Sequence, residues 1–306
     1  MTLVTSKPRT STPSTQPALL VLAAIASVQI GAAVAKQLFT ALGASGTVLV
    51  RLVTAAVLLL AVTRPRLRGI PRRHLGLVAG FGLVVGLMNL AFYAALARIP
   101  LGIAVTVEFA GPLAVAVIGS RRLRDLLWAA LAAIGVLLLT GGGAALLDGS
   151  LDPLGVALAA AAAAGWAGYI VLSQRVGAVL PSVQGLALAV AVAAVAVAPV
   201  GIATAGGALL QPRLLLIGAV VGVLSSALPW ALEMVALRSL TAATFGVLMS
   251  LEPAVAAVAG FAVLHERLTV PQIVAIAVTC AASAGAAGSA AGAGSAERPV
   301  EGETAG

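Results

Sequence analysis

Apolar runs of about twenty residues follow one another along almost the whole chain, and short polar or basic connections separate them. The runs are too long for the strands of a membrane barrel and lack the strict alternation of such strands. The pattern therefore predicts an all-α membrane protein with ten transmembrane helices. The predicted spans are 17–37, 45–63, 75–97, 101–119, 125–143, 153–173, 183–204, 213–236, 241–263 and 270–289.

The two ends of the chain differ from the apolar spans. Residues 1–16 are rich in Ser, Thr and Pro, and residues 290–306 are rich in Gly and Ala, so both are predicted to be disordered cytoplasmic segments. Lys7 and Arg9 precede the first apolar run in the manner of a secretory signal peptide. The run is longer than an ordinary signal core and no soluble domain follows it, which favours a first transmembrane helix.

The sequence contains an internal repeat. A shift of 141 residues places "ALARIPLG" from Ala95 on "ALRSLTAA" from Ala236, and it also aligns Pro112 with Pro253 and Asp125 with Glu266. Each unit, 17–143 and 153–289, holds five predicted spans, and an odd number of spans turns the second unit upside down. We predict two inverted five-helix repeats, the architecture of many secondary transporters. A chance resemblance between two Ala-rich halves is the alternative.

Composition and charge narrow the class of protein. Of 306 residues, 61% are hydrophobic and 9% are charged, too apolar a balance for a soluble domain. The net charge of +8 lies mostly in short arginine clusters without an aromatic-rich soluble module, so no nucleic-acid partner is expected. The single cysteine, Cys280, and the distant His74 and His265 offer no metal cluster, and neither a metal nor a cofactor is expected.

The basic residues also predict an orientation. With the N-terminus inside, thirteen basic residues fall on the cytoplasmic side and three fall outside. This bias predicts a multi-pass protein of the bacterial inner membrane with both termini in the cytoplasm. The cytoplasmic set is Lys7, Arg9, Arg64, Arg66, Arg68, Arg72, Arg73, Arg121, Arg122, Arg124, Arg175, Arg238 and Arg298, and the outer set is Arg98, Arg213 and Arg267.

Five charged residues lie inside predicted spans: Lys36, Arg51, Glu108, Glu233 and Glu252. A charge at the bilayer centre costs about 2.5 kcal/mol or more, so each is a candidate for substrate binding. Structural alternatives remain for all of them. Lys36 could extend to the interface and Arg51 could pair with an acid, while Glu108 could be a protonated acid bonded to a neighbouring helix. Glu233 could reach headgroup water or a nearby arginine, and Glu252 could only support a kink.

Prolines accompany these acids. A proline at position i has no N–H for the carbonyl at i−4, so Pro112 frees the carbonyl of Glu108 and Pro229 frees that of Ser225. Pro253 frees the carbonyl of Met249 in the same way. Interrupted helices near the middle of the membrane commonly form transporter sites, so we predict that both repeats contribute a broken helix to one central cavity.

Polar and aromatic residues on the other spans could line the same cavity. These are Gln29, Gln37, Asn89, Trp166, Tyr169, Ser225, Ser226 and Trp230. Interface anchoring or packing is the alternative for the aromatic residues. The pairs Gly82 and Gly86, and Gly218 and Gly222, form small-xxx-small faces that close helix packing explains without a ligand.

A cavity with charges of both signs suits a zwitterion. A cation such as Arg51 or Lys36 could hold a carboxylate, while Glu108 or Glu252 faces an ammonium group. Carboxyl groups bind protons more readily in a medium of low dielectric constant, so one acid could also carry a coupling proton. The sequence has no zinc-protease, nucleotide-binding or nucleophile–histidine motif, which favours a transporter over an enzyme. The expected partners are a small amino acid, protons and the lipid bilayer, and the chain could be a monomer or a dimer.

Several segments resemble one known family. "GAAVAKQLF", "PLGIAVTVEFAGPLAVAVIGSRR", "GWAGYIVLSQRVG", "SSALPWALEMVAL" and "TFGVLMSLEPAVAAV" are similar to the bacterial threonine/homoserine exporters, in the EamA branch of the drug/metabolite transporter superfamily. The resemblance covers nearly all of residues 17–289 and places the five charged candidates at family positions. His265 stands before Glu266 where the superfamily often has glycine.

The resemblance implies ten helices in two inverted repeats, cytoplasmic termini, and efflux of small amino acids driven by the proton gradient. Two alternatives remain at this point. The same fold could export another metabolite such as a purine, a drug or an osmolyte. The chain could also be a membrane scaffold that transports nothing.

Overall fold

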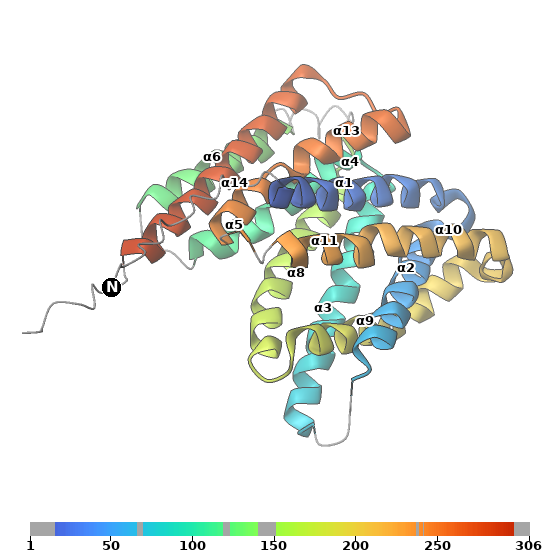
Figure 1. Cartoon of the computed structure of the whole chain (residues 1–306). Helices are drawn as coiled ribbons and strands as arrows, with labels where there is room; N and C mark the ends of the chain where they lie inside the picture. The colour runs from blue at the N-terminus through green and yellow to red at the C-terminus, as the bar shows by residue number, and fades with distance from the viewer. Residues whose placement is uncertain are drawn as a thin grey trace, which may run out of the picture.

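The structure is a computed structural model that describes residues 16–65, 70–118, 123–139, 151–236, 239–240 and 242–296. These residues are almost entirely helical (Figure 1). Six helices are long and apolar enough to cross a membrane, and three shorter apolar helical segments accompany them. The expected all-helical membrane class is therefore confirmed for this part of the chain.

The helices divide between the two halves of the chain. The first half contains α1 (Gln16–Gln37), α2 (Phe39–Thr63), α3 (Arg72–Leu96), α4 (Leu101–Glu108), α5 (Ala110–Ile118) and α6 (Leu123–Leu139). The second contains α8 (Pro153–Gly177), α9 (Ser182–Ala205), α10 (Pro212–Gly222), α11 (Leu228–Ala236), α12 (Ala242–Met249), α13 (Glu252–Leu264) and α14 (Val270–Ala296). Helices that follow each other end to end form single apolar segments, and within the described residues these segments number ten, as predicted.

Three segments are interrupted shortly before a proline, and α2 has a further kink at Gly43. The helix breaks at Phe109 between α4 and α5 and at residues 250–251 between α12 and α13. Between α10 and α11 it changes to a π-helical turn, Val223–Ala227. Pro112, Pro253 and Pro229 lie shortly after these points. A proline removes one backbone hydrogen bond and its ring collides with the carbonyl one turn earlier, so the helix cannot continue unchanged.

The chain ends differ from the prediction at one point. Helix α14 continues to Ala296, beyond the predicted end of the last span at 289, so the first residues of the predicted disordered tail are helical. Alanine is the best helix former, and four of the residues from 290 to 296 are alanines. The remainder of the tail and residues 1–15 lie outside the described part of the chain.

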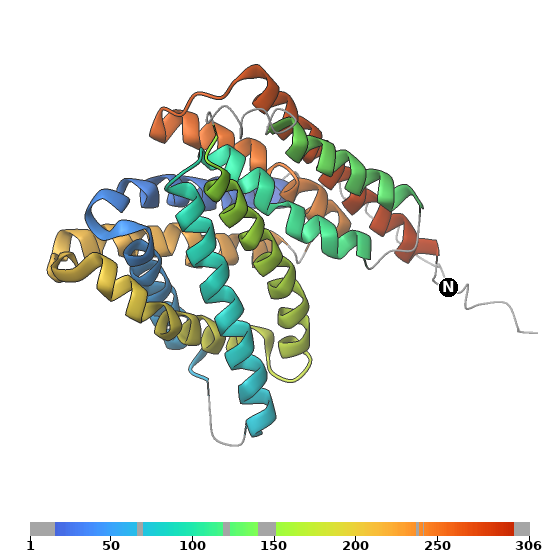
Figure 2. The same cartoon turned by 180° about the vertical axis from the view of Figure 1, so that it is seen from behind.

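The two halves pack into each other. Helix α2 lies along α9, α3 along α8, and α6 along α14, and α1 packs against α11 and α13 (Figures 1 and 2). One core of buried apolar residues runs through both halves. Each half therefore depends on the other to bury its helix faces, and the space between them belongs to both.

Small residues allow these helices to approach closely. A Cβ atom on Gly82 would lie 2.5 Å from the carbonyl oxygen of Ala189 on α9, and one on Gly218 would lie 2.4 Å from Cγ1 of Val50 on α2. Both distances are too short for real atoms, so these positions accept only glycine without movement of the neighbouring helix. The glycine faces seen in the sequence are packing surfaces, as their structural interpretation predicted.

A methyl group on Gly82 should destabilise the protein, whereas one on Gly80 of the same helix should not. Gly80 has no atom within 4 Å of its Cβ direction. We expect Gly82→Ala to lower the free energy of unfolding by about 1–3 kcal/mol through overpacking. Gly80→Ala should be neutral or stabilising by up to about 1 kcal/mol because alanine favours helix. Thermal unfolding of the two purified variants in detergent measures the difference, and equal melting temperatures would contradict the close contact between α3 and α9.

Candidate functional site

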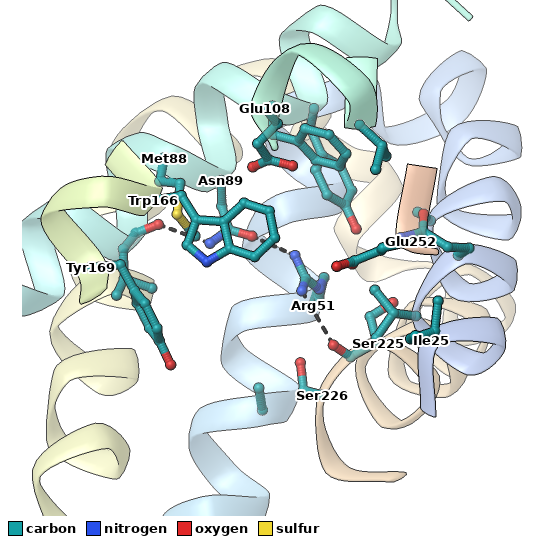
Figure 3. A pocket seen from close by; sticks show the side chains of 18 of the residues that line it. Ile25, Arg51, Met88, Asn89, Glu108, Trp166, Tyr169, Ser225, Ser226 and Glu252 are labelled. Atoms are coloured by element: carbon teal, nitrogen blue, oxygen red, sulfur yellow. Dashed lines mark hydrogen bonds between the residues drawn. The ribbon is translucent and has the colours of Figure 1, made fainter. Parts of the chain in front are cut away.

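A cavity of about 410 Å³ lies between the two halves (Figure 3). Its walls come from α1, α2, α3, α4, α8, α9, α11, α12 and α13 and from the π-helical turn. The interruptions after Glu108, before Glu252 and at Ser225 all open onto it. Its volume is in the range of pockets that hold small ligands.

Most of the residues singled out in the sequence meet in this cavity. The structure places Gln29, Arg51, Asn89, Glu108, Trp166, Tyr169, Ser225, Ser226, Glu233 and Glu252 on its lining. Trp230 lies on α11, and its side chain is outside the part that the structure describes. The three prolines mark the helix interruptions and do not themselves line the cavity.

Lys36 lies elsewhere. Its Nζ forms a 2.6 Å ion pair with Glu266 Oε1 and donates to the carbonyl of Ile99 at 3.2 Å. The other oxygen of Glu266 accepts from the backbone N–H of Leu101 at 2.8 Å. A Cβ on Gly260 would lie 2.5 Å from that oxygen, so glycine leaves the room that Glu266 occupies. Lys36 thus joins the end of α1 to the start of α4 and to the loop after α13, and it does not line the cavity.

Arg51 is the cation of the cavity. It donates through Nη1 to Asn89 Oδ1 and through Nη2 to the carbonyl of Ser225 at 3.4 Å, and its guanidinium lies 5.5 Å from the ring centre of Tyr93 (Figure 3). The Ser225 carbonyl is the one that Pro229 leaves without a helical partner. The ion pairs among described residues are Lys36–Glu266 and Arg98–Asp152, so no acid within the described chain forms an ion pair with Arg51.

Several buried polar atoms around the cavity lack a partner. On the Arg51 side these are potential donors: Arg51 Nε, Tyr93 Oη and Ser225 Oγ. On the α1–α13 side they are acceptors: Gln29 Oε1 and Glu252 Oε2. An unsatisfied buried polar atom costs about 1–3 kcal/mol, so a group of them at one cavity indicates a ligand site.

The three acids occupy different surroundings. Glu108 ends α4 and Glu252 begins α13, and each is 8% exposed. Glu252 Oε1 accepts from Gln29 Nε2 at 3.0 Å, while Glu108 has no hydrogen-bond partner among the described residues. Glu233 projects from α11 and is partly buried. None of the three forms an ion pair with Arg51.

Aromatic residues form one wall. Trp166 packs edge-on against Phe109 with ring centres 5.4 Å apart, and Tyr169 packs against Phe81 at 5.2 Å. Figure 3 shows Trp166, Tyr169 and Met88 on the side of the cavity opposite Ile25 and Glu252. These side chains give the cavity an apolar surface beside its charges.

The lining residues that were not predicted from the sequence include Tyr93 and Met88. Tyr93 follows Asn89 by four positions, so both point from the same face of α3. This spacing could have identified Tyr93 as a cavity residue once Asn89 was chosen. Met88 carries no comparable signal, because methionine is an ordinary packing residue.

Asp152 and Arg98 form a separate polar site at the start of α8. The Asp152 carboxylate caps the helix by accepting from the backbone N–H groups of Leu154 and Gly155, at 2.8 and 3.3 Å. A 2.8 Å hydrogen bond from Arg98, followed by those two N–H groups, lowers the pKa of Asp152 below its ordinary value. The pair is exposed and distant from the cavity, which indicates a structural role. Within the described ranges, no cluster of three His, Cys, Asp or Glu side chains could hold a metal ion.

Comparison with known proteins gives consistent matches. Residues 153–287 match the EamA-like transporter family. Over 270 residues, 88% of this chain, the chain is 44% identical to the threonine/homoserine exporter RhtA of Salmonella typhimurium and 42% identical to RhtA of Escherichia coli K12, and it spans 90% of each. A solved crystal structure shares the fold, with a TM-score of 0.58 at 19% identity over 92% of this chain and 99% of that one.

The Lys36–Glu266 pair should stabilise the protein more than the exposed Arg98–Asp152 pair. The side chains of the first pair are 23% and 14% exposed, and those of the second are 44% and 33% exposed. In double-mutant cycles made with Lys36→Met and Glu266→Gln, we expect a coupling free energy of about 1–3 kcal/mol. Arg98→Met and Asp152→Asn should couple by about 0–1 kcal/mol because water screens that pair. Equilibrium unfolding in mixed micelles measures both, and equal couplings would contradict the difference in burial.

Proposed function

The chain belongs to the EamA-like transporter family, and on that premise we propose that it exports threonine, homoserine or similar small amino acids across the bacterial inner membrane. Its 44% and 42% identical relatives are threonine/homoserine exporters, and the similarity extends over nearly their whole length. The candidate cavity is the place in the described structure where such a cargo would bind.

The separation of opposite charges in the cavity carries this proposal. Arg51 has no carboxylate partner, and the acids that share the cavity, Glu108, Glu252 and Glu233, have no cationic partner within it among the described residues. Unpaired charges in a low-dielectric interior are costly. A zwitterion that lies between Arg51 and one of these acids would pair charges of both signs at once, which neither a purine nor a neutral drug would do.

The orientation of the bound amino acid follows from the polar atoms that lack a hydrogen-bond partner. The α-carboxylate would lie toward Arg51 Nε, Tyr93 Oη and Ser225 Oγ, which can all donate and have no hydrogen-bond partner among the described residues. The ammonium group would lie toward Glu108. Lys36, the alternative anchor for the carboxylate, is engaged with Glu266 outside the cavity. The aromatic wall of Trp166 and Tyr169 would contact the side chain of the amino acid.

We propose alternating access between two inverted five-helix repeats as the transport mechanism. When the repeat shift of 141 residues is applied, Phe109, between α4 and α5, corresponds to residue 250, in the interruption between α12 and α13. The repeat relates α1 to α8, α2 to α9, and α3 to α10 and α11. Contacts between the halves respect this relation: α3 packs on α8 as α1 packs on α11, and α3 packs on α9 as α2 packs on α10. This reciprocity supports a pseudo-twofold relation between the units 17–143 and 153–289.

Export against a gradient requires a driving force, and the chain has no recognisable nucleotide-binding motif. We propose proton antiport, with both termini in the cytoplasm as the arginine distribution predicts. Transport by this mechanism needs one chain only, so a monomer is sufficient and a dimer would contain two independent cavities.

Cells that express the chain should release threonine and homoserine faster than cells without it. We expect efflux from preloaded cells to fall to the background rate with an uncoupler and in the Arg51→Gln variant, because that change removes the charge that holds the carboxylate. Arg213→Gln is the matched control, since Arg213 is an exposed arginine at the start of α10 and does not line the cavity. Unchanged efflux in wild-type cells at good membrane expression would refute the amino-acid assignment.

The cargo should need both of its charges. Threoninol lacks the carboxylate and N-acetylthreonine lacks the ammonium group, so each should compete with labelled threonine at least about tenfold more weakly than threonine itself, since each leaves buried charged groups unpaired. Homoserine should compete within about tenfold of threonine because it keeps both groups. Competition by a purine, a cationic drug or an osmolyte, without competition by homoserine, would instead identify the cavity as the site of another cargo.

A further inference from the structure

We infer that the paired side chains of Gln29 and Glu252 form the proton-binding site of the transport cycle, separate from the part of the cavity that holds the substrate. The inference rests on the proposed function, and it assigns the coupling proton to one acid among three. The pair joins α1 to the first residue of α13, across 223 positions of sequence. Gln29 Nε2 donates to Glu252 Oε1 at 3.0 Å.

The two oxygens of this pair that have no hydrogen-bond partner suit a proton better than an ammonium group. Glu252 Oε2 and Gln29 Oε1 are both sealed from solvent and both lack a partner. The pair offers two free acceptor atoms, whereas an ammonium group has three N–H donors to satisfy. A single proton needs only one further acceptor. Bound to Oε2, it gives the pair an O–H donor for which Gln29 Oε1 is the unoccupied acceptor, and the carboxyl and amide groups then satisfy each other.

Glu108 has the opposite properties. Its carboxyl group also lacks a described hydrogen-bond partner, and it lines the cavity without an amide group paired to it. It stands at the last residue of α4, where backbone carbonyls attract cations, and Pro112 leaves its own carbonyl without a helical N–H. Glu108 is therefore the acid placed to receive the ammonium group.

The proton site must also release its proton. Two features stabilise the charged form of Glu252: the N–H of Gln29 and its place at the N-terminal end of α13. The charged or titratable groups on the helices packed against α13 are Lys36 on α1, Glu108 on α4 and Cys280 on α14, while Arg51, Tyr93, Tyr169 and Glu233 face it across the cavity.

Each proton that Glu252 binds on the outer side is released on the cytoplasmic side, so protons are conserved over the cycle. When the cavity opens outward and the amino acid has left, a proton from the external medium binds Glu252 Oε2, and the neutral pair lets the empty cavity turn inward. There the O–H bond breaks, the proton passes to cytoplasmic water, and the next amino acid binds. One proton enters for each zwitterion that leaves.

The test compares two transport modes of purified protein in liposomes. Exchange of labelled for unlabelled threonine at equal pH requires substrate binding and alternating access, whereas transport driven by a pH gradient also requires the proton site. We expect Glu252→Gln to keep exchange within about twofold of wild type and to lose gradient-driven transport. Glu108→Gln should lose both modes, because it removes the acid that binds the ammonium group.

Gln29→Leu tests the pair itself. We expect it to keep exchange and to reduce gradient-driven transport by about tenfold, since it removes a hydrogen bond to a charged group. It should also displace the pH profile of gradient-driven transport, which a purely structural defect would not do. Gln37→Leu is the control on the same helix, because Gln37 contacts the carbonyl of Val263 at 3.4 Å outside the cavity, and both modes should be unchanged.

Loss of exchange in Glu252→Gln would overturn the inference by making Glu252 a substrate contact, and retained gradient-driven transport would place the proton elsewhere. Failure of the proposed function is a different result, in which wild-type protein moves no threonine or homoserine in either mode. The proton site is then read without substrate, from the infrared band of a protonated carboxyl group in pH titrations. We expect a carboxyl band that Glu252→Gln abolishes and Gln29→Leu shifts. A carboxyl band that neither variant changes would refute the assignment.

Discussion

The interaction on which this structure depends is the placement of a guanidinium inside an apolar helix bundle without an ion-pair partner. Such a charge needs polar contacts from the protein itself. Arg51 donates hydrogen bonds to the Asn89 side chain and the Ser225 carbonyl, and it makes a cation–π contact with the ring of Tyr93. The carbonyl is available only because Pro229 interrupts the helix with a π-helical turn. A broken helix, a polar residue on α3 and an open cavity thus follow from one charge on α2.

Much of the fold could be predicted because membrane helices leave a strong trace in sequence. Length and hydropathy placed the ten segments, and Pro112, Pro229 and Pro253 indicated where three of them break. The end of the last helix was wrong because composition was taken as a sign of disorder, whereas alanine continues a helix wherever no proline or strong polarity stops it. Which helices lie side by side could not be read from hydropathy, since every span is apolar on most faces.

The candidate site was predictable as a list of residues more than as an arrangement. Arg51, Asn89, Glu108 and Glu252 stood out because polar groups are costly in the membrane. Lys36 met the same criterion, yet Glu266, in a loop 230 positions away, holds it outside the cavity. The partnership of Gln29 with Glu252 likewise depends on a contact across 223 positions. Such contacts are properties of packing between the halves, and one sequence contains no record of them.

The glycine and alanine contacts between helices have a mechanical consequence. At surfaces such as the one where Gly82 meets Ala189, backbone and short side chains make the contacts, so movement of one helix along the other would require few changes of rotamer. The rate of alternating access would then be set by the few polar contacts between the two halves. Substitutions at those contacts could change the turnover rate while the glycine and alanine contacts between helices stay the same.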